Sequence, residues 1–530
     1  MVATPLFLEG EKTKDIKITR ANHEIEKQNA EKPSIQTKPK SDQNPVESKK
    51  PSVNRAERRQ VLHSSKFLRE LLAIIYSYFP GLINQLKQVE DPRYKSYTKY
   101  DISVLLLERI FAAIFGVSSM RELTSEFSDE NMIKNIATIL NQNLEELPSH
   151  DTINNCFKKL STTELERIIH DMIVSLTRRN TFNKSRLRGK YWQVLVDGTA
   201  LSSFNNRHCD NCLYRRHKNK KGEVTRVEFY HYVLEAKLVL HENLVFSICT
   251  EFVENEGKIP SEEELYSPDY DEPGYERAKQ DCEIKAFYRL ADKLKQAFPR
   301  LPICITADSL YANQQVFEKC QVNNWRFILR FKEGSIPSLY NKFCQASTKV
   351  GHSFRIFIKK DSYTISANED VTPIDEIYDG FIKFEYTYAN DLHYEGYSIN
   401  MVECKDSRVK YPFLFLTDLP IDQKNCESTV EDGRRRWRIE NEAFKVQKQH
   451  GYYLKHVFCE DYNAMKVHYL AIQIAHAISQ LLEHGSDVIK NLNITLKEFH
   501  KSLLKCFGVV TLTLEDLVAA QKQRKFRLSC

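Results

Sequence analysis

Long apolar runs and a strong net charge are both missing from this chain of 530 residues. No stretch approaches the roughly 20 consecutive apolar residues of a membrane-spanning helix, since the most apolar run, residues 102–117, is broken by Glu108 and Arg109. The first residues lack a basic segment followed by an apolar one, so no signal peptide is expected. The sequence therefore predicts a protein without a membrane partner.

A disulfide framework is also missing. The 13 cysteines are scattered without regular spacing, which is typical of a reduced, cytoplasmic protein. Only Cys209 and Cys212 stand close together, as C-x-x-C. With His208 and His217 they could form a four-ligand zinc site, although a reduced cysteine pair in a basic loop explains the same residues without a metal.

The net charge by itself does not indicate a nucleic-acid partner, because the 77 Lys and Arg residues exceed the 71 Asp and Glu residues by only six. Two-thirds of this excess lies in residues 1–60, which hold 13 basic residues, 9 acidic residues and one aromatic residue, Phe7. Such a segment buries too little apolar surface to fold. It is predicted to be a disordered tail.

Residues 61–185 are predicted to form an all-α domain. Apolar residues recur there with the three- and four-residue spacing of amphipathic helices, as in Phe67, Leu68, Leu71, Leu72, Ile75 and Tyr78. Helix starts are expected at Ser149 and at Ser161. A small helical domain ahead of an α/β domain often binds DNA, so this domain is predicted to do so, although helical packing alone explains the pattern equally well.

From residue 186 the pattern changes to apolar, β-favouring runs that alternate with helical segments, which predicts an α/β domain with a mixed sheet. Strands are expected at residues 191–196, 229–240, 244–252, 301–306 and 325–331, and helices at residues 278–297, 313–320 and 461–483, the last one amphipathic. The domain comprises residues 186–334 and 426–490. Residues 335–425 are predicted to be a β-rich insertion, and residues 491–530 a C-terminal segment.

Three carboxylates stand at positions that suit a metal site. Asp197 ends the run YWQVLVD and Asp308 ends the run LPICITAD, and mixed sheets place their sites at such carboxyl ends of strands. Glu440 lies in RRRWRIENE, on a helix expected to begin at the capping box of Ser428 and Glu431. Carboxylates from separate elements suit Mg²⁺ or Mn²⁺. Taken singly, each acid has a simpler explanation as a turn residue, a helix cap or a surface ion-pair partner.

Taken together, the segments VLVDGTALSSF, ITADSLYANQQVF and RRWRIENEAFKVQKQHGYYLKH resemble the three acidic motifs of bacterial insertion-sequence DDE transposases, in the branch with a β-strand insertion between the second Asp and the Glu. The resemblance covers most of residues 85–485. It implies a ribonuclease H-like catalytic core, with Asp197, Asp308 and Glu440 as metal-binding catalytic acids. It also implies Mg²⁺ or Mn²⁺ as cofactor, transposon-end and target DNA as partners, and a homodimer or larger assembly on DNA.

The motif around the Glu departs from the family pattern at two places. In the family a Tyr, an Arg, the Glu and a Lys follow one another with two, three and six intervening residues. Arg436 and Glu440 fit this pattern. Gly433 stands at the Tyr position and Gln447 at the Lys position, with Lys448 one place later. The roles of the family's Tyr and Lys are therefore not assigned to Gly433 and Gln447.

Two basic segments lie beside these motifs. Residues 207–226 and residues 434–455 hold seven Lys and Arg residues each. Phosphate neutralisation by such residues drives DNA affinity, and aromatic side chains among them can stack on a displaced base. A charged run is also what a solvated surface shows. The predicted DNA contacts are Arg215, Arg216, Arg436, Trp437 and Lys448.

Three functions are compatible with these features: a transposase that cleaves transposon ends and joins them to target DNA, a stand-alone metal-dependent DNA nuclease, and an inactive DNA-binding relic. The helical domain and the β-rich insertion favour the transposase, because a simple nuclease needs neither to find specific ends. The presence of all three acids argues against a relic. Glu442 is a rival third acid, but Glu440 shares a helix face with Arg436 and is preferred.

Overall fold

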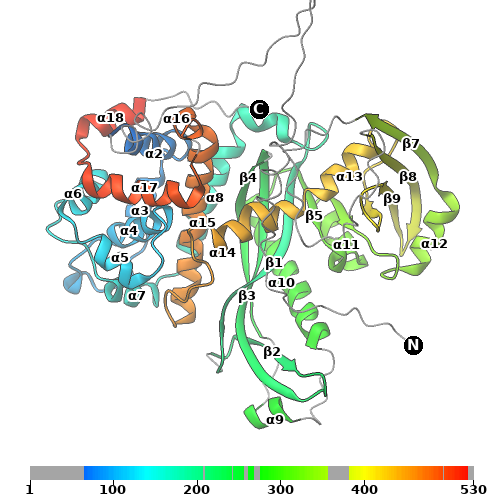
Figure 1. The fold of residues 1–530 in the computed structure, drawn as a ribbon, viewed down its shortest axis with the longest axis horizontal. Helices are drawn as coiled ribbons and strands as arrows, with labels where there is room; N and C mark the ends of the chain where they lie inside the picture. The colour runs from blue at the N-terminus through cyan, green and yellow to red at the C-terminus, as the bar shows by residue number, and fades with distance from the viewer. Residues whose placement is uncertain are drawn as a thin grey trace, which may run out of the picture. The chain divides into compact units, whose positions relative to one another are not determined.

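The computed structural model describes residues 65–206, 209–241, 243–255, 261–267, 275–355, 381–492 and 494–522. Helices occupy the chain up to residue 185, and a mixed sheet with surrounding helices follows (Figure 1). The predicted mixed α/β architecture with a helical N-terminal region is thereby confirmed. The tail predicted for residues 1–60 lies outside the described residues.

The N-terminal region consists of short helices joined by short loops: α2 (Ser65–Tyr78), α3 (Leu82–Lys87), α4 (Ile102–Ile114), α5 (Met120–Glu126), α6 (Glu130–Leu140), α7 (His150–Phe157) and α8 (Thr162–Thr177), with 3-10 turns at Lys95–Tyr97 and Asn180–Ser185. The two predicted helix starts are confirmed, since α7 and α8 follow Ser149 and Ser161 directly. The Ser149 side chain accepts a hydrogen bond from the backbone N–H of Thr152, which satisfies one of the free donors at the helix start.

The C-terminal segment returns to this helical region. It forms α16 (Asp487–Lys490), α17 (Leu496–Val509) and α18 (Leu514–Lys522), and α17 and α18 both pack on α2. The buried amide of Asn135 on α6 donates to the carbonyl oxygens of Phe507 and Val510, both at 2.8 Å, and accepts from the N–H of Leu512 at 2.7 Å. The end of the described chain therefore completes the packing of the N-terminal helices.

Helix α15 (Tyr462–Gly485) lies between the helical region and the sheet (Figure 1). It packs against α2, α4, α7 and α8 and also against strand β4 (Leu244–Val253), and nearly all its residues from 464 to 482 are buried. The helix predicted at residues 461–483 is therefore confirmed, but its predicted amphipathic character was wrong. Two of its buried polar side chains bind cationic groups: His468 accepts from Nε of Arg109 at 2.8 Å, and Gln473 accepts from Nζ of Lys237 at 2.5 Å.

Ten strands form one sheet within the described ranges: β1 (Trp192–Phe204), β2 (Leu213–Lys218), β3 (Val224–His241), β4, β5 (Ile303–Ala307), β6 (Arg326–Arg330), β7 (Thr348–Arg355), β8 (Phe381–Tyr394), β9 (Tyr397–Asp406) and β10 (Phe413–Thr417). The order is β2-β3-β1-β5-β6-β10-β9-β8-β7, with β4 paired to β3. β1 runs antiparallel to β3 and parallel to β5, and β5 runs parallel to β6. The predicted strands at residues 191–331 all lie in this sheet.

The chain between residues 335 and 425 continues this sheet. It begins with helix α12 (Pro337–Ala346), which packs on β8, and then supplies β7 to β10. β10 pairs antiparallel with β6, with Phe415 opposite Arg330, so the β-rich segment is joined edge to edge with the preceding strands. In the part of this segment that the structure describes, strands predominate, and backbone hydrogen bonds tie them to the strands before it.

The remaining helices are α9 (Glu262–Tyr266), α10 (Tyr275–Ala297), α11 (Gln314–Val322), α13 (Cys426–Arg434) and α14 (Val446–Gln449), with a π-helix, η4, at Ile439–Lys445. α13 starts two residues before Ser428, whose hydroxyl donates to the carbonyl of Asn425 at 3.1 Å, so the predicted capping box was wrong. The predicted single long helix is instead interrupted after Arg434 and continues as η4 and α14. Nowhere in the described part of the chain is a helix both long and apolar enough to cross a membrane.

Because α15 packs on both the helical region and the sheet, removing apolar volume from it should weaken the whole packed unit. Leu470 is fully buried on α15. We expect Leu470→Ala to lower the free energy of unfolding by about 2–5 kcal/mol, as is usual when a leucine leaves a cavity. Urea denaturation followed by circular dichroism measures this change.

The matched control is Val322→Ala, at a side chain that is 76% exposed at the end of α11. It should change the free energy of unfolding by less than about 0.5 kcal/mol. Equal effects of the two substitutions would contradict the central position given to α15.

Candidate active site

Two aspartates lie side by side because of one parallel strand pair. β1 pairs with β5 in a register that sets Leu195 opposite Thr306, so two residues further along each strand Asp197 and Asp308 stand opposite one another. The first residues of β1 are buried, and Asp197 is the first that is only half-buried. Asp308 follows β5 and accepts a hydrogen bond from the N–H of Leu310 at 2.9 Å, which starts the 3-10 turn η3 (Ser309–Tyr311). Asp308 therefore both caps the 3-10 turn and lies next to Asp197 in the site.

The surroundings of Asp197 disfavour its negative charge. Burial raises the pKa of Asp197 to about 7; the Arg436 guanidinium opposes this shift, while the charges of Asp308 and Glu283 add to it. Nη1 of Arg436 lies 3.1 Å from Oδ2 of Asp197. The aspartates are therefore crowded carboxylates held next to one cation.

Glu283 is an acid of this site that the sequence reasoning missed. It is buried on α10 and accepts a hydrogen bond from the Tyr311 hydroxyl at 2.9 Å. Burial raises the pKa of Tyr311 well above its usual value, and the charges of Glu283, Asp308 and Asp197 add to that shift. A signal was present, because Glu283 occupies the apolar face of α10 three, four and seven residues before Ala286, Phe287 and Leu290.

Glu440 lies at the rim of the site, and its neighbours distinguish it from Glu442. Burial lowers the pKa of Lys448 to about 8, and the charge of Lys455 adds to this shift. The negative charges of Glu440 and Asp197 oppose it, so both carboxylates interact electrostatically with Lys448. Glu442 instead has Arg438 and Lys445 as charged neighbours. It also adds to the raised pKa of Glu483 on α15. Glu442 therefore faces α15, whereas Glu440 faces the side of Asp197.

The carboxylate oxygens of Asp197, Asp308 and Glu440 do not all lie within 4.8 Å of one another. Within the described ranges, only Cys209, Cys212 and His231 bring three potential ligand atoms within 4.8 Å of one another. Asp197 and Asp308 are brought together by the strands, and Glu440 is exposed on η4. The arrangement offers two adjacent carboxylates with a third on a neighbouring helix.

The π-helix η4 explains why Lys448 stands one residue after the family's Lys position. Gln447 is fully buried and donates to Gln473 at 2.8 Å, so it does not reach the site. Lys448 is half-buried, and its ammonium group donates to the hydroxyl of Thr199 on β1. A π-helix closes its hydrogen bonds over five residues where an α-helix uses four, so η4 accommodates one extra residue. Lys448, eight residues after Glu440, thereby takes the place that the seventh residue would have on a regular α-helix.

Gly433, at the family's Tyr position, is required by packing. A Cβ atom there would lie 2.6 Å from the ring of Phe415 on β10. α13 therefore lies directly on the sheet at this point. A tyrosine could not occupy the position without moving the helix.

The predicted DNA contacts differ in their exposure. Arg215 is exposed on β2 and lies over the ring of Tyr230, with its guanidinium carbon 5.4 Å from the ring centre. Its neighbour Arg216 points to the other face of the strand, is 8% exposed and donates to the carbonyl of Ser267 at 2.7 Å. The prediction of a surface role for Arg216 was therefore wrong. Trp437 is 46% exposed beside the site.

The predicted four-ligand zinc set is also corrected. Nε2 of His217 lies 3.0 Å from a carboxylate oxygen of Glu228, so His217 is engaged elsewhere. His208 lies outside the described residues. His231 of β3 approaches Cys209 and Cys212 instead. Sequence spacing could not reveal His231, because it lies 19 residues after Cys212 and reaches it only through the pairing of β2 with β3.

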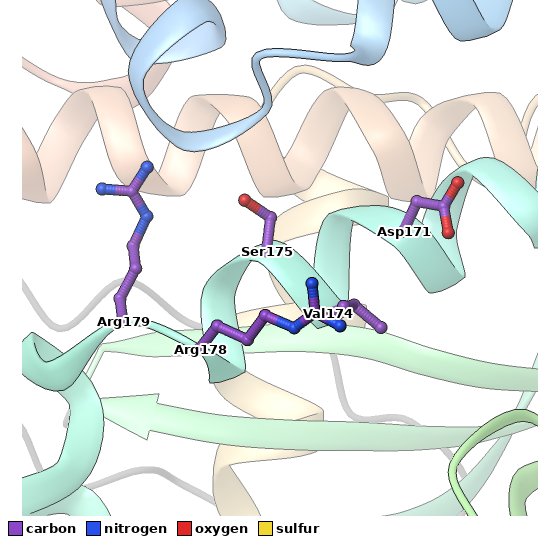
Figure 2. A pocket seen from close by; sticks show the side chains of 5 residues that line it. All are labelled: Asp171, Val174, Ser175, Arg178 and Arg179. Carbon is purple, nitrogen blue, oxygen red and sulfur yellow. The ribbon is translucent and has the colours of Figure 1, made fainter.

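A pocket at the end of α8 lies in the helical region and is lined by Asp171, Val174, Ser175, Arg178 and Arg179 (Figure 2). Several of its polar groups serve packing: Asp171 accepts from Gln85 at 2.6 Å, and Ser175 donates to the carbonyl of Tyr78 at 2.6 Å. The guanidinium of Arg179 lies over the ring of Tyr78 at 4.4 Å. These contacts join α8 to α2 and α3 and mark no reactive site.

Comparison with known families agrees with this architecture. A family model described as Transposase DDE domain matches residues 278–478, and one described as DDE_Tnp_1-associated matches residues 83–173. The first match includes Asp308 and Glu440, and the second includes helices from α4 to α7. These matches define a transposase of the DDE type.

The two matches together cover more than half of the chain, which belongs to the insertion-sequence DDE transposases. No curated protein matches it. Asp197 lies between the two matched segments, so its place beside Asp308 rests on the strand register alone.

The raised pKa of Asp197 predicts how stability depends on pH when divalent ions are removed. The folded-state pKa of about 7 lies above the unfolded value, so the stability that this group contributes is complete at low pH and is lost as pH rises from about 4 to 7. With EDTA present, Asp197→Asn should be more stable than the parent chain at pH 8, by roughly 1–2 kcal/mol after allowance for solvent screening. At pH 5 the difference should shrink. Thermal melts at both pH values measure it.

Glu318→Gln is the control, because Glu318 is exposed on α11 and should give the same small difference at both pH values. If Asp197→Asn is less stable than the parent at pH 8, the ion pair of Asp197 with Arg436 stabilises the fold by more than burial and carboxylate repulsion destabilise it.

Proposed function

We propose that the chain cleaves phosphodiester bonds at transposon ends and joins the freed ends to target DNA, with Asp197, Asp308 and Glu440 holding divalent metal ions. The parallel register that sets Asp197 opposite Asp308 is the observation that carries this proposal. Family membership supports the substrate class, because it implies DNA.

The donor set fits Mg²⁺ or Mn²⁺. All three proposed ligands are carboxylates, and hard divalent cations take oxygen ligands and keep positions open for substrate phosphate. The raised pKa of Asp197 reflects, after burial, the charges of Asp308 and Glu283, and a divalent cation would relieve exactly this kind of repulsion. When bound, such ions activate water and stabilise the leaving oxygen of a phosphodiester.

Basic residues of the third motif are proposed to hold the DNA backbone. The charges of Asp197 and Glu440 both act on Lys448, so its ammonium group would bind a phosphate oxygen next to the proposed metal ligands. Arg436 is 29% exposed and holds Asp197, so it can exchange that carboxylate for a phosphate. The exposed Trp437 offers a face for a displaced base, and Arg215 a contact further along the DNA.

The strand order supports a ribonuclease H-like core. β4, β3 and β1 are antiparallel neighbours, and β1, β5 and β6 are parallel neighbours. Asp197 lies on β1 and Asp308 directly follows β5, and Glu440 comes from a helix after the β-rich insertion. We propose that residues 186–334 and 426–490 form the catalytic domain and that the helices of residues 61–185 bind DNA.

A homodimer or larger assembly on DNA is proposed because joining two ends requires more than one active site. The stand-alone nuclease remains the second candidate, since it would use the same acids. The relic is disfavoured by the adjacent carboxylates and by Lys448, which keeps its place despite the shifted sequence position.

The experiment incubates the chain with labelled DNA from both ends of its element, a target plasmid, and Mg²⁺ or Mn²⁺. We expect cleaved ends and joined products. Asp197→Asn and Asp308→Asn should each lower cleavage by roughly 10⁴-fold, as removal of an essential member of a catalytic unit does, with DNA binding nearly unchanged. Cleavage without joining would favour the nuclease.

Glu440→Gln and Glu442→Gln form a matched pair on the same π-helix. Glu440→Gln should abolish cleavage, whereas Glu442→Gln should retain it, because Glu442 faces α15. The opposite result would exchange the roles of the two acids and refute the proposed site.

Lys448 should contribute to both affinity and rate. Lys448→Ala should lower cleavage by about 10²-fold, as loss of one charged group at a reacting phosphate does, and should reduce the slope of log affinity against log salt by about one. Lys445→Ala, at an exposed lysine of η4, is the control. An unchanged salt slope for Lys448→Ala would remove its proposed phosphate contact.

A further inference from the structure

We propose that Cys209, Cys212 and His231 bind a zinc ion that anchors the β2–β3 hairpin, separately from the proposed catalytic metals. The three residues form the group of potential metal ligands noted above, and none belongs to the acidic site. The family matches do not include these residues, since they end at residue 173 and resume at residue 278.

The distances among the three ligand atoms fit one tetrahedral ion. The two Sγ atoms are 3.7 Å apart, and Nε2 of His231 lies 3.6 Å from Sγ of Cys209 and 3.7 Å from Sγ of Cys212. With zinc–sulfur bonds of about 2.3 Å and zinc–nitrogen bonds of about 2.0–2.1 Å, tetrahedral geometry requires separations of about 3.8 Å and about 3.6 Å. Each of the three distances agrees with the tetrahedral value.

The fold builds this arrangement from two neighbouring segments. Cys209 and Cys212 form a turn in which the Cys212 N–H donates to the Cys209 carbonyl at 3.3 Å. The register of β2 with β3 sets Leu213 opposite Tyr230, so Cys212 and His231 stand opposite one another at the next position. Cys212 and His231 are almost fully buried. The ligands are therefore positioned by backbone pairing before any ion binds.

The ring of His231 is held from a second side. It stacks on Tyr462 at the start of α15, with ring centres 4.5 Å apart and planes at 25°, and meets the edge of Phe204 at 6.0 Å. Such contacts fix the ring orientation and leave Nε2 directed at the two sulfur atoms. Fixing a ligand histidine through its surroundings raises the affinity of a metal site.

A disulfide is the main competing explanation for the cysteine pair. Disulfide sulfurs lie about 2.05 Å apart, and 3.7 Å is far outside that distance. A disulfide also gives no role to His231. Thiolate ligands select zinc over Mg²⁺ and Mn²⁺, so this site and the carboxylate site would not compete for the same ion.

The zinc ion would stabilise the β2–β3 hairpin. β2 and β3 extend beyond the rest of the sheet as a two-stranded ribbon with α9 beside it (Figure 1). The core beneath it is small, comprising Cys212, Val227, Phe229 and Leu265. Two-stranded ribbons are marginally stable, and small cores need an added staple. Zinc would therefore help to stabilise the hairpin that carries Arg215.

Zinc binding would release the two thiol protons to solvent and leave two thiolates and a neutral imidazole on the ion. These three protein ligands leave the fourth tetrahedral position to water or another group. The proposal concerns folding of the hairpin, so it does not depend on whether the chain cleaves DNA.

The test begins with the full chain purified under reducing conditions. Mass spectrometry of the metal content should give about one zinc per chain, and Asp197→Asn should leave that value unchanged. Replacement by Co²⁺ should give the visible absorption of a tetrahedral site with a thiolate charge-transfer band. Cys212→Ser and His231→Gln should lose the zinc and the band, whereas Cys344→Ser, at an exposed cysteine of α12, should keep both.

Hydrogen exchange supplies a second readout. Removing zinc from the parent chain with a chelator should speed exchange in β2 and the facing part of β3 and leave β5 unchanged. Folded parent chain that takes up neither zinc nor Co²⁺ would overturn the proposal. Binding that survives both ligand substitutions, or a Cys209–Cys212 disulfide in the reduced preparation, would overturn it as well.

Discussion

The parallel pairing of β1 with β5 is the constraint on which the site depends. It brings the half-buried Asp197 and Asp308 together at the carboxyl ends of the two strands, and the buried Glu283 of α10 adds a third carboxylate. This arrangement costs stability, because burial raises the pKa of Asp197 and the charges of Asp308 and Glu283 add to that shift. The Arg436 guanidinium offsets part of this cost, because its Nη1 lies 3.1 Å from Oδ2 of Asp197.

A second constraint is the buried polar network under the third motif. Gln447 donates to Gln473 on α15, which also accepts from Lys237, and Lys237 lies 3.0 Å from the fully buried Glu235. Such a network contributes little net stability, but it favours the one helix register in which all its hydrogen bonds form. It keeps α14 in place against α15, and so determines that Lys448, and not Gln447, faces Thr199.

Much of this could be predicted from sequence, because local patterns reflect local physics. Alternating and continuous apolar runs located the strands that carry Asp197 and Asp308, and serine caps located α7 and α8. What sequence missed depends on tertiary packing: α15 is buried on all sides because two layers cover it, and η4 is a π-helix that shifts the register of Lys448. Strand pairing likewise decided that His231, and not His217, meets the cysteines.

The central claim is that Asp197 and Asp308 share a divalent metal with Glu440 close by. Anomalous diffraction from crystals of the full chain soaked in Mn²⁺, with transposon-end DNA bound, tests it most directly. We expect an anomalous peak between the carboxylates of Asp197 and Asp308, with Glu440 as a further ligand. Mn²⁺ bound elsewhere, with these two carboxylates free of metal, would contradict it.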